Sequence, residues 1–151
     1  MGVAPREVYS SPRSFVHEKE KHVAANHYGI TDFQYIAAGS AILASGGGGS
    51  YYDAVSVITE LAAVWSGTVP VQDYDGATNC CVLAMMGSPD AATSLTLANV
   101  VQSIANTVNL MESTTGAILG CVIPVETGPI NSIMPLIAAA IPGNFIAWVV
   151  D

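Results

Sequence analysis

The sequence predicts an α/β domain built around a parallel β-sheet. In its C-terminal half, apolar runs typical of buried strands alternate with segments of helical periodicity. In its N-terminal half, two further helical segments are separated by four consecutive glycines. Strand, helix, strand, helix, strand at these lengths is typical of right-handed βαβ crossovers, so we expect a parallel sheet covered on both faces. The 151 residues suit a single domain with its own core.

Residues 1–21 are the only charge-dense stretch. We expect them to form an arm that is disordered alone or lies on a neighbouring subunit, ahead of a single domain over 22–151. This arm contains all four basic residues of the chain, Arg6, Arg13, Lys19 and Lys21. A chain with no cation beyond Lys21 lacks a nucleic-acid surface, and it could hold a phosphate-rich substrate only with a partner's charges.

The amino-acid composition also indicates whether the chain is an oligomer, whether it spans a membrane and in which compartment it resides. At 51% hydrophobic and 11% charged residues, it is apolar for a soluble protein, so we expect an oligomer whose surface is partly covered. The first residues lack the apolar segment of a signal peptide, and the apolar run 133–150 is interrupted by prolines, so we expect no membrane span. Three cysteines without a CxxC pattern favour buried thiols and a reducing cytoplasm.

The first helix is expected from Thr31 to about Ser45, because Thr31 and Gln34 have the spacing of a capping box. Ser50 is expected to cap a second helix that ends before Gly67. The three histidines, His17, His22 and His27, are five residues apart, which matches neither a helical face nor a zinc site, so we interpret them as solvated.

The glycine run, Gly46 to Gly49, lies between these two helices. Such a run allows the backbone to lie close against a ligand or a neighbouring chain segment, although a flexible connector would have the same sequence. No lysine follows it, as a Walker loop would require, and Tyr51 stands where a dinucleotide fingerprint needs glycine. The helix N-terminus at Ser50 could hold a carboxylate or an imide oxygen.

Residues 68–71 are β-branched but contain Pro70, which predicts an edge strand. Asp73, Asp75 and Gly76 then predict a solvated turn; a calcium loop is the alternative, but its twelve-residue spacing is missing. Strands are expected over 81–86, 117–125 and 145–150, with helices over 94–111 and 132–141 between them.

Parallel strands point the same way, so the segments that follow them meet at one edge of the sheet, where ligands of open α/β proteins bind. The candidate residues in these segments are Gly87, Ser88, Glu126, Gly128, Asn131, Ser132 and Asp151. Glu126 and Asp151 have no lysine or arginine nearby in the sequence, a setting suited to general acid–base work. Asn131 and Ser132 can cap a helix or donate to a substrate oxygen. The alternatives are that Glu126 is a solvated loop acid and that Asn131 and Ser132 are plain caps.

Taken together, six stretches resemble a known family. They are 30–32, 36–39, 43–49, 86–89, 125–132 and 149–151. Their residues and order are similar to the N-terminal domain of the S-methyl-thiohydantoin desulfurase-like family, also called DUF917 and associated with hydantoinase-type proteins. The resemblance covers about residues 30–151. Members usually have an acidic residue and a proline after the glycines, where this chain has Ser50 and Tyr51.

The resemblance implies a hydrolase-type subunit that acts on a C–N or C–S bond of a small cyclic amide or thiohydantoin. Glu126 would activate a water, the Gly46–Ser50 loop with Gly87 and Ser88 would hold the oxyanion, and Asp151 would orient the water or bind a divalent metal supplied with a partner. Family chains continue beyond Asp151, so this chain is a small subunit completed by a second chain, a fragment, or a degenerate member; the apolar composition and missing cations favour the second chain. The alternatives are a non-catalytic assembly protein and a small-molecule binding module.

Overall fold

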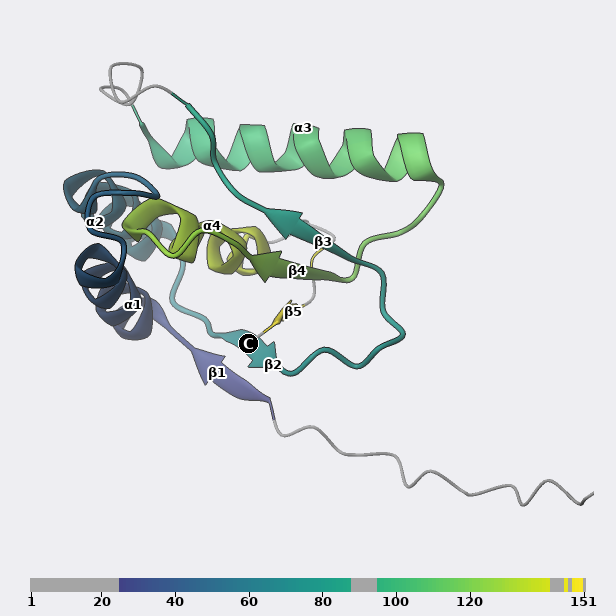
Figure 1. Ribbon diagram of the computed structural model, residues 1–151, viewed down its shortest axis with the longest axis horizontal. Coiled ribbons are helices and arrows are strands. Elements are labelled where there is room, and N and C mark those ends of the chain that lie inside the picture. The colour runs from purple at the N-terminus through teal and green to yellow at the C-terminus, as the bar shows by residue number, and fades with distance from the viewer. Residues whose placement is uncertain (1–24, 88–94, 142–145, 147, 151) are drawn as a thin grey trace, which may run out of the picture.

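The computed structural model describes residues 25–87, 95–141, 146 and 148–150, and contains four helices and a five-stranded sheet (Figure 1). Their order along the chain is β1 (Asn26–Tyr28), α1 (Ile30–Leu43), α2 (Tyr51–Val64), β2 (Val69–Gln72), β3 (Cys80–Leu83), α3 (Leu97–Thr115), β4 (Cys121–Pro124), α4 (Pro129–Ala140) and β5 (Trp148–Val150). The predicted α/β class is confirmed. The predicted arm, residues 1–21, lies outside the described residues.

The strands are arranged in the order β1-β2-β5-β4-β3. β2, β5, β4 and β3 run parallel, and β1 pairs antiparallel with β2. The prediction that residues 68–71 form an edge strand is therefore wrong, because β1 covers the outer side of β2. Pro70 is tolerated in this interior strand because the pairing of β2 with β5 begins at Val71, one residue later.

The four helices lie on one face of the sheet. Both crossovers step in the same direction, from β3 to β4 to β5, so right-handed connections place α3 and α4 on the same side. α4 packs against β2, β3, β4 and β5, and it lies between α3 on one side and α1 and α2 on the other (Figure 1). On the opposite face, no described helix covers the strands and Val82 is 57% exposed. The predicted coverage of both faces is therefore wrong for the described part of the chain.

α4 is the centre of the core. Its sequence is apolar on all sides, and most of its residues are buried between the sheet and the other helices. The helix begins at Pro129, three residues before the predicted beginning. Proline suits this position because N–H groups in the first turn of a helix have no partner within the helix, and proline has no N–H group.

Local hydrogen bonds and backbone conformation determine where the other helices begin or end. α1 begins at Ile30 rather than Thr31, because the Asp32 carboxylate accepts from the Gly29 N–H at 2.8 Å, and Gln34 takes no part. Ser50 caps α2 as predicted, since its Oγ accepts from the Tyr52 N–H at 3.2 Å. α3 ends where Gly116 adopts a left-handed φ of 70°.

The cysteines differ from the predicted buried thiols. Cys80 and Cys121 are joined by a disulfide, and only Cys81 is free and buried. The two joined residues occupy directly paired positions on β3 and β4, with their Cα atoms 4.6 Å apart. This pairing could not be seen from two cysteines that are 41 residues apart in the sequence. As for membranes, the described helices are all too short or too polar to cross one.

Candidate functional site

The glycine run packs against the start of α4. The Gly48 carbonyl accepts from the N–H groups of Ile130 at 3.0 Å and Asn131 at 3.1 Å, both in the first turn of α4. A methyl group on Gly128 would lie 2.3 Å from the Gly47 carbonyl oxygen, and one on Gly48 would lie 2.5 Å from the Gly128 Cα. Only glycine at both positions allows the two backbones to approach this closely.

Glu126 lies in the loop between β4 and α4, beside this contact. Its φ of 58° is in the left-handed region, which is uncommon for a residue with a side chain. The Glu126 Oε2 atom accepts from the Asn131 Nδ2 at 3.1 Å. The carboxylate is exposed and, because residues 25–150 contain no lysine or arginine, no basic side chain of this part of the chain neutralises it.

Asn131 connects Glu126 to the sheet. Its side chain is 2% exposed, and its Oδ1 accepts from the Met85 N–H at 2.8 Å, just beyond β3. Because Oδ1 accepts from a backbone N–H, the amide is oriented with Nδ2 toward the Glu126 carboxylate, where an amide donor is required. Asn131 therefore holds the loop after β4 against the end of β3.

A cavity of about 220 Å³ opens beside Glu126. It lies at the carboxyl ends of β2, β4 and β5, between these strands and the helices α1 and α4. Its lining is mostly apolar, with hydroxyl groups and one carboxylate: Tyr28, Ile36, Val71, Pro124, Val125, Glu126, Thr127, Ser132, Leu136, Val149 and Val150. An apolar hollow with a few polar groups is the usual form of a small-molecule site.

The structure brings six of the candidate residues together: Gly47, Gly48, Glu126, Gly128, Asn131 and Ser132. Among them, Glu126 and Ser132 line the cavity, whereas Gly48 and Gly128 form the backbone contact beside it. Ser88 and Asp151 lie outside the described residues.

Gly46, Gly49, Ser50 and Gly87 are neither lining residues of the cavity nor part of the contact between Gly48 and Gly128. Gly46 has a φ of 102° and open space around it, and Gly87 likewise has open space. Gly49 packs against the Ile130 side chain, and the Ser50 hydroxyl is engaged in capping α2.

Of the residues that line the cavity, only Glu126 and Ser132 were site candidates from the sequence; Tyr28, Ile36 and Thr127 are among those that were not. Thr127 could have been, since it lies between Glu126 and Gly128 in the loop already chosen. Tyr28 could not, because β1 is three residues long and only its pairing with β2 brings it to the cavity.

A metal site and a cysteine nucleophile have less support in the described residues. Within this part of the chain, no group of three His, Cys, Asp or Glu side chains could hold a metal ion. Burial raises the pKa of the Cys81 thiol, and nearby Glu112 raises it further, so the thiolate needed for a nucleophile is disfavoured.

Comparison with family models identifies the family. The family model described as the S-Me-THD-like N-terminal domain matches residues 31–147. A solved structure of a protein from Chromobacterium violaceum, a structural-genomics target, is similar with a TM-score of 0.65 and 27% sequence identity. The match covers 84% of this chain and 34% of that chain, so this chain spans about a third of that protein's length. No curated protein matches. Since the family model covers more than half of the chain, this protein belongs to the S-Me-THD-like family and carries its N-terminal domain.

Proposed function

We propose that this chain is part of a hydrolase-type enzyme that breaks a C–N or C–S bond in a small cyclic amide or thiohydantoin-like molecule. The observation that carries the proposal is the Glu126 carboxylate, held by the buried Asn131 amide at the mouth of an apolar cavity. The family name adds the substrate class, because it refers to S-methyl-thiohydantoin-like proteins.

Glu126 is suited to act as a general base. Its carboxylate is fixed on one side by Asn131 Nδ2 at 3.1 Å and remains exposed, so it can contact a water molecule. No arginine or lysine within residues 25–150 competes for the carboxylate.

For a C–N bond, the step is a hydrolysis. Glu126 removes a proton from water, and the resulting hydroxide adds to the ring carbonyl carbon to give an oxyanion. When this intermediate collapses, the C–N bond breaks and the nitrogen receives the proton from Glu126, which returns the carboxylate to its starting state. For an S-methyl substrate, the hydroxide adds instead to the ring C=N carbon that carries the sulfur. The C–S bond then breaks, methanethiol leaves with the proton from Glu126, and the C–OH group left on the ring becomes a carbonyl as its proton moves to the ring nitrogen.

The cavity lining suits a small ring with polar edges. Val71, Leu136 and Val149 offer apolar contacts to the ring, and the hydroxyl groups of Thr127 and Ser132 can bond to its carbonyl and N–H groups. In the proposal, Gly46, Gly47, Gly49 and Ser50 border the site, Gly87 and Ser88 contribute amides to the oxyanion, and Asp151 orients the water. Gly48 and Gly128 hold the loop in place through the contact described above.

The site would be completed by further protein. The present chain matches only the N-terminal domain of its family, and residues 25–150 supply no cation for a developing negative charge. We therefore expect oxyanion stabilisation to be strengthened by a basic residue from another domain or chain.

The test is turnover of hydantoin and S-methyl-thiohydantoin by the assembly purified from its own source, whose chains are first identified by native mass spectrometry. We expect Glu126→Gln to lower kcat by about 100-fold or more, because the carboxylate is the base. Asp73→Asn, an exposed carboxylate in the turn after β2, is the matched control and should leave turnover unchanged. Full turnover by Glu126→Gln would contradict the proposal.

A small-molecule binding module would give a different result. In that case, hydantoin would raise the melting temperature of both the wild type and Glu126→Gln, and no product would form in either sample.

A further inference from the structure

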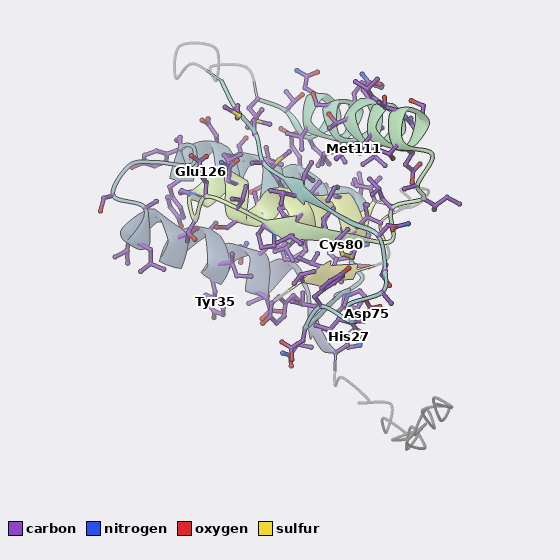
Figure 2. The ribbon with its side chains drawn as sticks, turned by 45° about the vertical axis from the view of Figure 1, so that its right-hand side comes forward. His27, Tyr35, Asp75, Cys80, Met111 and Glu126 are labelled. Carbon is purple, nitrogen blue, oxygen red and sulfur yellow. A yellow bond between two sulfur atoms is a disulfide. The ribbon has the colours of Figure 1, made fainter. Side chains whose placement is uncertain are left out.

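The outer face of α1 is apolar and uncovered. Tyr35 is 72% exposed, Ile42 81% and Leu43 76%, and Figure 2 shows Tyr35 pointing outward from the helix. Gly39 lies between them on the exposed side, with open space where a side chain would be. No charged residue occurs from Phe33 to Tyr52. This surface, centred on Tyr35, Ile42 and Leu43, is called the α1 face below.

The α1 face differs from the surface of an ordinary solvent-exposed helix. α3 buries Val100, Ile104 and Val108, and its exposed side is mostly Gln, Ser, Asn and Thr, with Leu110 and Met111 as its exposed large apolar residues. Scattered apolar residues of that kind are normal. A helix that is apolar on all sides is normally covered on all sides, and a contiguous exposed patch marks an interaction surface.

The α1 face also adjoins the candidate site. Ile36, the neighbour of Tyr35 in α1, lines the cavity together with Glu126. The glycine run that follows Leu43 lies against the loop carrying Glu126. A protein surface that covers α1 would therefore lie beside the cavity.

The Chromobacterium violaceum relative indicates what covers the face. This chain matches only 34% of that protein, so most of the relative's length has no counterpart here. A second copy of this chain is a poor occupant, because residues 25–150 carry carboxylates and no lysine or arginine. Asp32 and Asp53 lie just outside the uncharged stretch, so a complementary partner has an apolar centre and basic residues at its rim.

We propose that the α1 face docks the protein domain that corresponds to the remaining length of the Chromobacterium violaceum relative, through an apolar surface rimmed by lysine or arginine. The occupant has this chemistry whether it continues this chain or is a separate polypeptide. The proposal rests on the family and the surface, not on the hydrolytic chemistry above.

Cysteine labelling tests the proposal without any substrate. Ile42→Cys is prepared in the 151-residue chain and in a full-length chimera, in which this chain replaces the matched part of the Chromobacterium violaceum protein. We expect maleimide to react about tenfold or more slowly with the chimera, because a docked surface must open before it can react. Leu110→Cys on α3 is the matched control and should react equally fast in both, while the wild type reports the background from Cys81.

A second measurement is a control for a chimera that does not fold correctly. Cysteine is placed at the position of the intact Chromobacterium violaceum protein that superposes on Ile42, and it too should be protected. Equal labelling rates for Ile42→Cys in the short chain and the chimera, with a reactive cysteine in the intact relative, would overturn the proposal. If Ile42→Cys is already protected in the short chain, and sedimentation shows that the short chain is a dimer, the proposal is overturned in favour of a second copy.

Discussion

Two pairs of glycines at opposite ends of the sheet are required for different reasons. At the carboxyl end, Gly48 and Gly128 touch backbone to backbone, with no room for a methyl group on either. At the amino end of β3 and β4, Gly76 and Gly116 have left-handed φ values of 75° and 70°, yet a methyl group on either would meet nothing within 4 Å. Figure 2 shows Glu126 and Asp75 in these two separate parts of the molecule.

The difference indicates where the structure tolerates change. A glycine needed only for its φ can be replaced at a conformational cost, whereas a glycine needed for space cannot be replaced without moving another chain segment. The carboxyl end joins three segments that are distant in sequence: the glycine run, the end of β3 and the start of α4. At the amino end, the turns at Gly76 and Gly116 are local, and only two segments, those before β3 and β4, are joined, through bonds of Asn79 to Ile118 and Gly120.

The largest effect is expected for Gly128→Ala. The added methyl would collide with the Gly47 carbonyl oxygen and the Gly48 Cα, both at 2.3 Å and both backbone atoms that cannot rotate away. We expect a loss of about 3 kcal/mol or more in the free energy of unfolding, measured by urea denaturation. Gly116→Ala has only its positive φ to oppose it and should cost about 1 kcal/mol. Equal losses for the two variants would remove the distinction between the ends.

Asn131→Ala should have the next largest effect. It leaves the Met85 N–H without its side-chain acceptor in a part-buried position and releases the Glu126 carboxylate. We expect about 1–3 kcal/mol of destabilisation, together with a lower protection of the Met85 amide in hydrogen exchange. The control is Asn106→Ala on the exposed side of α3, where the lost bond from Gln102 should cost less than about 0.5 kcal/mol. A Met85 amide that stays protected would show that Asn131 is not the link between β3 and the loop.

The smallest effect is expected for Asp75→Ala at the amino end. The Thr78 hydroxyl, together with the N–H groups of Thr78 and Ala77, donates to the Asp75 carboxylate and holds its pKa below the ordinary value of 3.8. A lowered pKa means that the ionised form stabilises the fold. The contribution is therefore complete above pH 3.8 and is lost as the pH falls through the lower folded value.

Melting temperatures measure this contribution. Asp75→Ala should melt slightly below the wild type at neutral pH, and the gap should close as the pH is lowered past 3.8. A constant difference between Asp75→Ala and wild type at every pH would exclude the carboxylate as its cause.

Much of the fold could be predicted from local patterns. Periodicity located all four helices and the three strands of the βαβαβ half, and Ser50 was identified as a cap because capping depends on neighbouring residues. β1 was missed because a three-residue strand carries almost no periodicity. The position of β2 and the single covered face depend on strand order, which is set by contacts between distant segments.

In the candidate site, too, local contacts could be predicted from the sequence and contacts between distant segments could not. Glu126 and Asn131 are five residues apart, and a loop entering a helix brings them together, so their proximity was accessible from the sequence. The contact of Gly48 with Gly128 spans eighty positions and depends on α1 packing against α4. Tyr28 and Ile36 enter the cavity for the same reason, through tertiary packing that no local pattern reports.

The place of β5 also has a consequence for the order of folding. It is the last of the five strands along the sequence, yet it lies between β2 and β4, and no other strand joins the two halves of the sheet. While the chain is being synthesised, β1 can pair with β2 and β3 with β4, but isolated two-stranded pairs are marginal in water. Until residues 148–150 leave the ribosome, the inner edges of β2 and β4 have no partner, which is when the nascent chain is most exposed to aggregation and to holdase chaperones.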